Sequence, residues 1–146
     1  MDEDDAIGPL GTANFRVIIA GVEIGFASVS GISSEATPDE KGANVFRTVM
    51  FRRAVDGTKD LWNWRRAVVE GKDDRRDVVI EHLDDHERVA NTWVLHEAWP
   101  VRWSGPAFDA MMGGVAMEEL ELSYRRLTWD HPPDSEHERS HHAGRS

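Results

Sequence analysis

Histidines and carboxylates are the side chains in this sequence that could do chemistry, by holding a metal ion or by moving protons. There are seven histidines and no cysteine, which excludes disulfides, thiolate zinc sites and cysteine nucleophiles. Four histidines and two glutamates gather near the C-terminus: His131, His137, His141, His142, Glu136 and Glu138. Zinc needs ligands that are held rigidly by a supporting shell, which this polar segment does not provide. We expect a solvated tail with only adventitious nickel or zinc affinity, and no cofactor.

The other polar patterns do not form a recognisable catalytic site. Three histidines fall in predicted strands and their turn: His82, His86 and His96. No Gly-x-Ser-x-Gly elbow accompanies them, so the sequence gives no support for a nucleophile triad. The adjacent acids Glu118 and Glu119 would point to opposite faces of a strand, so they cannot flank one substrate bond. We interpret them, like Asp84-Asp85, as surface charges or ion-pair partners, and we expect no enzyme.

A glycine pair also fails to make a phosphate site. Gly113-Gly114 is followed by neither the lysine nor the helix that a phosphate-binding loop requires. The formal charge of -10 opposes nucleic-acid binding, which depends on a basic face. We therefore expect no nucleic-acid specificity.

Length and composition indicate one soluble domain. The chain has 146 residues, of which 40% are hydrophobic and 30% are charged. No apolar run approaches the roughly 20 residues of a membrane helix, so we expect no direct membrane insertion. The N-terminus is acidic where a signal peptide is basic, which favours a location in the cytoplasm.

Three regions follow from the distribution of charged and apolar residues. Residues 1–13 are acidic and punctuated by glycine and proline, which predicts a flexible arm. Residues 130–146 have almost no aliphatic side chains and predict a disordered His-rich tail. The folded domain is expected at residues 14–129.

Period-two alternation dominates that domain and predicts a mainly β fold. The predicted strands cover residues 15–20, 24–30, 45–55, 77–83, 88–99 and 115–129. In the last of these, Leu120, Leu122 and Tyr124 alternate with polar residues. We expect six to eight antiparallel strands that form a β-barrel or sandwich.

One segment, at about residues 59–70, has helical spacing instead. Leu61, Trp64 and Val68 would share one helix face, with arginines on the other side. Thr58 is placed to cap the start, and Gly71 suits the position just beyond the end.

The strand at residues 88–99 is apolar on both faces. Trp93 and Leu95 would lie on one face, with Val94 and Ala98 on the other. Such a strand is covered on both sides, or by a neighbouring subunit. Pro100 is expected to limit its continuation.

Six tryptophans in 146 residues are a large amount of aromatic surface for one small domain. Each could pack in the core or fill an interface, where tryptophan concentrates binding energy. A single barrel has difficulty burying so many, which favours an oligomer.

Several segments, taken in order, resemble one known family. They include Leu61-Trp62-Asn63-Trp64-Arg65, Ala98-Trp99-Pro100 followed by Trp103, and Val115-Ala116-Met117-Glu118-Glu119-Leu120. The chain resembles the tail tube proteins of contractile phages and of phage-tail-like, extracellular contractile injection systems. The resemblance assigns family-motif and assembly roles to eleven residues: Leu61, Trp62, Trp64, Arg65, Ala98, Trp99, Pro100, Trp103, Ala116, Glu118 and Leu120.

The resemblance implies a barrel-like subunit with one outer helix, six copies of which close a ring. Rings would stack into a hollow tube inside a contractile sheath. The implied partners are other copies of the chain, the sheath protein, the baseplate or hub, paralogous tube proteins and cargo in the lumen. The product would be a phage-tail-like particle that can be released from the cell.

One segment is shorter than the resemblance leads us to expect. Only about twenty residues separate Gly31 from Phe51, where family members carry a long hairpin used in ring-to-ring stacking. The inter-ring loop would consist of Thr37, Pro38, Asp39, Glu40, Lys41 and Gly42. The alternatives are therefore a tube-initiating or tube-end ring at the baseplate, or a secreted type VI-like hexameric ring. We expect the chain alone to form single rings or short stacks.

Overall fold

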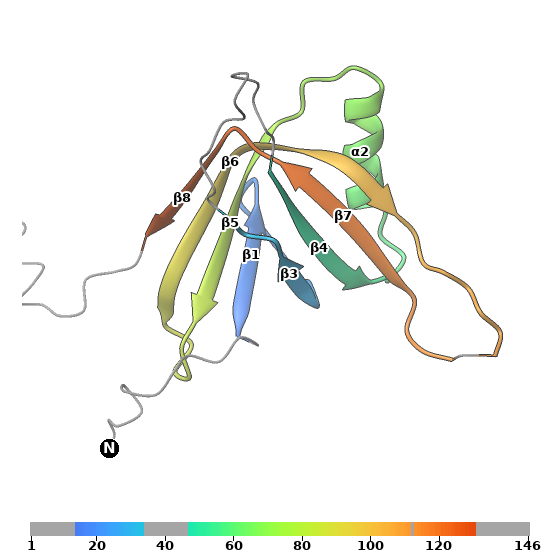
Figure 1. Ribbon diagram of the computed structural model, residues 1–146, viewed down its shortest axis with the longest axis horizontal. Coiled ribbons are helices and arrows are strands. Elements are labelled where there is room, and N and C mark those ends of the chain that lie inside the picture. Colours follow the sequence, from blue (N-terminus) through green and yellow to red (C-terminus); the bar gives the residue numbers. More distant parts are fainter. Residues whose placement is uncertain (1–13, 34–46, 112, 131–146) are drawn as a thin grey trace, which may run out of the picture.

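The computed structural model describes residues 14–33, 47–111 and 113–130. Eight strands and one helix lie in these residues (Figure 1). They are β1 (Phe15–Ile19), β2 (Val22–Ile24), β3 (Ser28–Ser30), β4 (Thr48–Ala54), α2 (Asp60–Val69), β5 (Arg76–Leu83), β6 (Val89–Ser104), β7 (Met117–Ser123) and β8 (Arg126–Asp130). The predicted arm, the Thr37–Gly42 loop and the tail from residue 131 onward lie outside the described residues.

The strands pair in the order β2-β1-β5-β6-β7-β4-β3, and β8 pairs with β6. All of these pairings are antiparallel. The 16-residue strand β6 joins the two halves of the sheet, because Val89–Ala98 pairs with β5 and Trp99–Ser104 pairs with β7. In Figure 1 the two halves slope away from each other below β6, and α2 lies by the right-hand part of β6, which it contacts. The prediction of a mainly β barrel or sandwich with one helix is confirmed.

One apolar core holds the two halves of the sheet and α2 together. The strands contribute inward side chains that are at most 3% exposed: Val17, Ile19, Val49, Phe51, Val78, Ile80, Leu95, Leu120 and Leu122. Leu61 and Trp64 extend the same core from α2. Full burial of such a side chain contributes about 1.5–3 kcal/mol, so this core is the main source of stability.

The start of α2 differs from the prediction. Lys59 occupies the N-cap position without a capping hydrogen bond from its side chain. The Thr58 hydroxyl instead donates to Asp56 and accepts from Arg53. The prediction that Thr58 caps the helix is therefore wrong. The carboxylate of Asp60 accepts a hydrogen bond from the Leu61 N–H at 2.9 Å, at the positive end of the helix dipole.

The end of α2 follows the prediction. Gly71 has φ +97°, a conformation that glycine adopts without the steric penalty of a Cβ. Its N–H donates to the Val68 carbonyl at 3.0 Å, and the Lys72 N–H donates to the Ala67 carbonyl at 3.0 Å. These two bonds satisfy carbonyls that the helix would otherwise leave open.

A bulge at Glu97 changes the alternation along β6. Val78 pairs with Leu95 but Arg76 pairs with Ala98, so two residues of β6 lie opposite one residue of β5. Glu97 takes a positive φ of 54° at this point. The bulge turns Ala98 into the core on the side of Leu95, so the prediction that Ala98 shares the face of Val94 is wrong.

Strand β6 also continues through Pro100, where the sequence predicts a limit. Pairing with β5 ends at Ala98, and Pro100 pairs with Leu122 of β7. The register shifts again between Pro100 and Arg102. A proline is tolerated here because the strand has already lost its neighbour on one side.

Two predicted strands are interrupted and one begins later. The segment 24–30 breaks between β2, which pairs with β1, and β3, which pairs with β4, so it crosses between the halves of the sheet. The segment 115–129 breaks at Tyr124-Arg125 into β7 and β8. The pairs Trp99–Ser123 and His96–Arg126 keep one register, and the break lies opposite the Glu97 bulge. The strand predicted at 45–55 corresponds to β4, which begins at Thr48. Residues 45 and 46 of the predicted strand lie outside the described part.

Candidate functional site

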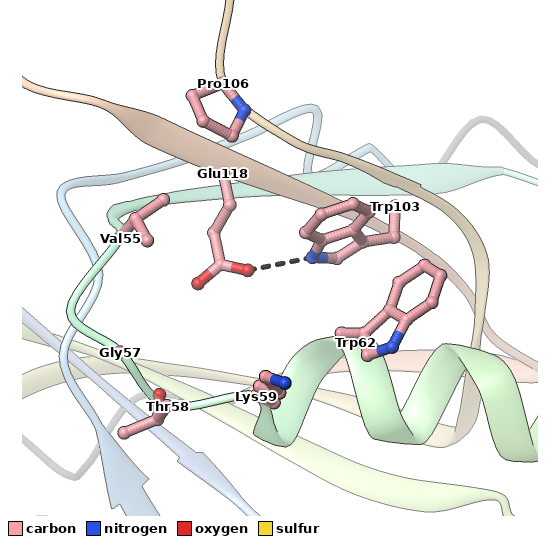
Figure 2. A pocket seen from close by; sticks show the side chains of 8 residues that line it. All are labelled: Val55, Gly57, Thr58, Lys59, Trp62, Trp103, Pro106 and Glu118. Carbon is pink, nitrogen blue, oxygen red and sulfur yellow. Dashed lines mark hydrogen bonds between the residues drawn. The ribbon is translucent and has the colours of Figure 1, made fainter.

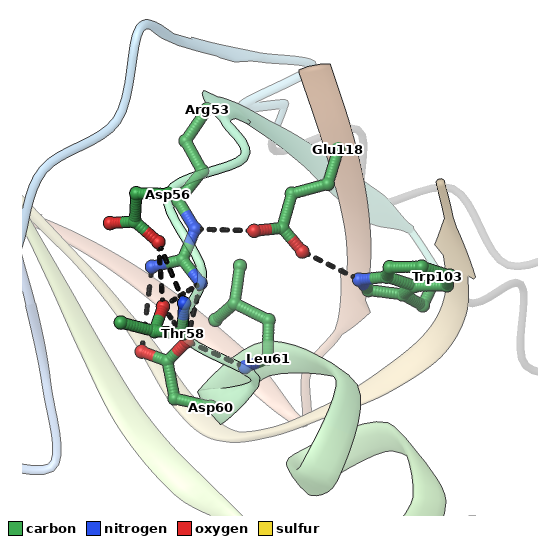
Figure 3. Close-up of polar contacts among 7 residues, drawn as sticks. All are labelled: Arg53, Asp56, Thr58, Asp60, Leu61, Trp103 and Glu118. Carbon is green, nitrogen blue, oxygen red and sulfur yellow. Dashed lines mark hydrogen bonds and ion pairs between the residues drawn. The ribbon is translucent and has the colours of Figure 1, made fainter. Parts of the chain in front are cut away.

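A buried ion pair joins β4, β7 and α2 (Figure 3). Arg53 and Glu118 are register partners, and they are only 6% and 4% exposed. Arg53 Nε donates to Glu118 Oε2 at 2.7 Å, and its Nη2 pairs with Asp60 at the start of the helix. The other Glu118 oxygen accepts a hydrogen bond from the Trp103 indole N–H at 2.8 Å. This network fixes the start of α2 against the sheet.

The charges in this network stabilise one another. Burial opposes the charge on Arg53, but hydrogen bonds and attraction from Asp60 and Glu118 outweigh it and raise the pKa of Arg53. Burial likewise opposes the charge on Asp60, while Arg53, Thr58 and the Leu61 N–H outweigh it and hold the pKa of Asp60 below its ordinary 3.8. Arg53 and Asp60 therefore remain ionised at neutral pH.

This lowered pKa predicts a loss of stability in acid. A carboxyl whose folded-state pKa is depressed contributes its stability fully above its unfolded pKa, and loses it as pH falls through the folded value. The Asp60→Asn variant should be less stable than the parent chain by about 1 kcal/mol at pH 7, since Asp60 is partly exposed. The difference should shrink as pH falls below 3.8, and urea unfolding at pH 7 and pH 3 measures it.

The exposed Asp85→Asn variant is the control for this measurement. An Asp60→Asn deficit that is the same at both pH values would contradict the role of the Asp60 charge. Four further carboxyls also have lowered pKa values, each because a hydrogen bond from a neighbour favours the carboxylate: Asp56, Asp74, Asp84 and Glu121. The parent chain should therefore lose stability in acid by more than Asp60 alone contributes.

An open apolar pocket lies beside this network (Figure 2). Its volume is about 360 Å³. Its lining comes from the connection between β4 and α2, from α2, β6 and β7, and from the segment after β6: Val55, Gly57, Thr58, Lys59, Trp62, Trp103, Pro106 and Glu118. The rings of Trp62 and Trp103 meet edge to face at 5.0 Å, and Trp62 is 41% exposed. Because its walls are apolar and open to solvent, the pocket is suited to receiving another apolar group.

The described histidines have structural neighbours. His82 stacks on Trp93 at 6.4 Å, and His96 Nε2 hydrogen-bonds the Thr128 hydroxyl at 3.0 Å. His86 lies exposed in the turn before β6. In residues 14–33, 47–111 and 113–130, no three histidine or acidic side chains gather in a way that could hold a metal ion. The tail histidines lie outside these ranges.

The part of the chain that the structure describes contains no helix with the length and apolarity needed to cross a membrane.

Comparison with known families decides the identity of this fold. The sequence profile described as T4-like virus tail tube protein gp19 matches residues 11–128. The chain belongs to this tail tube family. The resemblance found in the sequence is therefore confirmed.

Several solved structures share this fold. A chain in the cryo-EM structure of the sheath–tube complex of the extracellular contractile injection system PVC matches with a TM-score of 0.77 and 23% identity, over 90% of this chain and 99% of that chain. A chain in the PVC sheath/tube terminator structure matches with a TM-score of 0.74 and 24% identity, over 84% and 97%. Hcp1 from Flavobacterium johnsoniae matches with a TM-score of 0.58 and 18% identity, over 81% and 95%. No curated protein sequence matches the chain.

Nine of the eleven tail tube motif residues are buried or lie at the pocket. Six are buried: Leu61, Trp64, Ala98, Pro100, Glu118 and Leu120. Trp62 and Trp103 line the pocket, and the Ala116 carbonyl accepts a hydrogen bond from the N–H of Val55 at the pocket edge. Their roles in assembly stay predictions.

The remaining two motif residues lie on α2 and β6. Arg65 donates to the Pro100 carbonyl at 3.2 Å and so ties α2 to β6. Trp99 is half-buried, with the Arg75 guanidinium 4.5 Å from its ring centre. The predicted inter-ring loop, Thr37–Gly42, is not among the described residues.

Sequence reasoning missed two parts of the site. It gave no role to Arg53 in the ion pair or to Lys59 at the pocket rim. The burial of Arg53 could have been predicted from its position two residues after Phe51, since residues two apart on a strand share a face.

Proposed function

We propose that this chain is the subunit of the inner tube of a contractile, phage-tail-like injection system, and that six copies close a ring. The observation that carries the proposal is the family match over residues 11–128, which covers all but the last residue of the predicted folded domain. Rings stack inside a sheath and act with a baseplate or hub and with paralogous tube proteins. The role is structural and not enzymatic.

The exposure of the tryptophans supports assembly. Trp64 is 1% exposed, whereas the other five tryptophans keep part of their surface open in the single chain. Trp62 is 41% exposed, and Trp129, which stacks on Trp93 at 5.9 Å, is 61% exposed. Exposed aromatic side chains of this size are typical of interfaces, where they provide much of the binding energy.

The ends of the sheet support assembly as well. Among the described residues, β2 pairs only with β1 and β3 pairs only with β4. Free sheet edges expose unpaired backbone groups and favour association with another chain. A closed ring covers such edges in every copy.

The proposal includes the lumen of the tube and the place where the rings assemble. Six copies around an axis enclose a lumen that can hold cargo. Rings assemble in the cytoplasm of the bacterium and leave the cell as part of the particle.

A tube-end ring is the second candidate. The observation that favours it is the short Gly31–Phe51 connection, since a main-tube subunit needs extended contacts from ring to ring. The likeness to a chain in the PVC sheath/tube terminator structure, with a TM-score of 0.74, is compatible with this role. A secreted type VI-like ring is a more distant candidate, because Hcp1 matches with a TM-score of only 0.58.

Expression of the chain alone tests the proposal. We expect native mass spectrometry to show hexamers and negative-stain electron microscopy to show single rings or short stacks. Folded monomers only, at high protein concentration, would contradict the proposed function. Long regular tubes at physiological salt would exclude the tube-end ring and leave the main tube subunit.

A further inference from the structure

The segment between β6 and β7, residues 105–116, presents apolar side chains with nothing to cover them in the single chain. Phe108 is 86% exposed, Met111 is 91% exposed and Val115 is 72% exposed. Figure 1 shows this segment extending well beyond the ends of β6 and β7, away from the body of the sheet. Such a concentration of exposed large apolar side chains marks an interaction surface.

The tip of this segment is folded locally. Asp109 Oδ1 accepts a hydrogen bond from the Met111 N–H at 2.9 Å. This bond holds Phe108 and Met111 on either side of one turn. The tip of the segment, residues 108–111, therefore has a defined local conformation.

The apolar pocket lies at the base of the same segment, where Pro106 forms part of its lining. Its walls are the exposed faces of Val55 and Trp62 together with Trp103 (Figure 2). Its volume of about 360 Å³ lies at the lower end of the range of sites that enclose small ligands, and it can accept an aromatic side chain. In the single chain, Phe108 stays exposed and does not fill this pocket.

The charges of the two surfaces are complementary. Asp109 is the only charged residue in segment 105–116. Lys59 brings positive charge to the pocket, and the negative charge of Glu118 is already balanced by Arg53. An incoming tip would therefore bring a carboxylate towards an ammonium group and apolar side chains towards tryptophan.

We propose that the Phe108–Met111 tip of one copy docks into the Val55–Trp62–Trp103 pocket of a neighbouring copy. This proposal rests on the proposed assembly of the chain and names a contact within it. Each copy gives a tip and receives one, so the contact is head-to-tail and repeats around a closed ring or along a stack. The pocket is completed by the neighbour.

Disulfide cross-linking tests this contact cleanly, because the chain has no cysteine of its own. Phe108→Cys and Val55→Cys place one thiol on the tip and one in the pocket. A disulfide forms only if the two Cα atoms come within about 7 Å. Val69→Cys is the control, since Val69 is also an exposed valine but lies at the last position of α2, outside the pocket lining.

The single variants are first mixed under reducing conditions, and native mass spectrometry checks that they form rings. On oxidation, the mixture of Phe108→Cys and Val55→Cys chains should give covalent dimers, and the double variant should give a ladder of oligomers. The mixture of Phe108→Cys and Val69→Cys chains should stay monomeric on a denaturing gel.

Several outcomes would overturn the proposal. Rings without a Phe108–Val55 cross-link would reject the contact and leave the proposed function standing. A cross-linked monomer of the double variant, without dimers in the mixture, would show that the pocket receives the tip of its own chain. Cross-linking through Val69 instead of Val55 would place the tip elsewhere, and the absence of any ring of the parent chain would reject the contact and the proposed function together.

A second measurement does not depend on disulfide geometry. Phe108→Ala should raise the protein concentration needed for half-assembly by about tenfold, as expected for an aromatic anchor at an interface. Val69→Ala should leave that concentration unchanged. Equal effects of the two variants would contradict docking through Phe108.

Discussion

A Trp64→Ala variant is expected to lose about 3–5 kcal/mol of its free energy of unfolding. Trp64 is 1% exposed, and its indole N–H donates to the Asp74 carbonyl at 2.7 Å. The Arg76 guanidinium lies 4.5 Å from the ring centre. Truncation opens a cavity under α2 and removes the partner of the Asp74 carbonyl. Small domains have about 5–15 kcal/mol in total, so urea unfolding should show a variant close to its folding limit.

Trp62→Ala is the matched control, because Trp62 lies two positions earlier on the same helix and is 41% exposed. Its truncation should change stability by less than about 1 kcal/mol, as expected for a surface position. If Trp62→Ala destabilised the chain as much as Trp64→Ala, the assignment of one tryptophan to the core and the other to the pocket would be wrong.

The sequence predicted much of the core because strand periodicity carries that information. Leu120, Leu122 and Tyr124 alternate in β7 and just beyond it, and all three are buried. The spacing of Leu61 and Trp64 likewise predicted the buried face of α2. Apolar side chains that are buried recur at the spacing of one face of a strand or helix. This spacing can be recognised in the sequence without knowledge of the fold.

The bulge at Glu97 could not be predicted in the same way. Glutamate has no preference for a positive φ, and its value of 54° is imposed by the pairing of β6 with β5. The N–H of Glu97 is satisfied by Asp77 Oδ1 at 3.0 Å, from a residue 20 positions away. Because contacts between distant residues decide this backbone geometry, local patterns assigned Ala98 to the wrong face.

The positions of the tryptophans could be predicted only in part. Their number indicated a large apolar surface, but composition left core and interface open for each one. Trp64 belongs to the core, while Trp62 and Trp103 form an open pocket. Trp103 reaches this pocket on a strand that runs past Pro100, which the sequence alone did not predict.

Arg53→Met is the second variant with a large expected effect, a loss of about 3–5 kcal/mol of unfolding free energy. It leaves the Glu118 carboxylate, which is 4% exposed, without its charged partner. The Trp103 N–H alone does not balance a buried negative charge. Urea unfolding at pH 7 measures the loss.

The neighbouring pair on the same two strands is the control. Arg52 and Glu119 are also register partners and form an ion pair at 3.0 Å, but their side chains are 45% and 34% exposed. Arg52→Met should change stability by about 1 kcal/mol at most, because exposed ion pairs contribute little. Equal losses for Arg52→Met and Arg53→Met would contradict a special role for the buried pair.

A double variant separates a lost charge partner from lost packing. The double variant Arg53→Met/Glu118→Leu removes the stranded carboxylate and should recover most of the loss, because an apolar pair of similar volume can replace a buried ion pair. A double variant no more stable than Arg53→Met would show that Arg53 acts through its shape and through its bond to Asp60 at the start of α2.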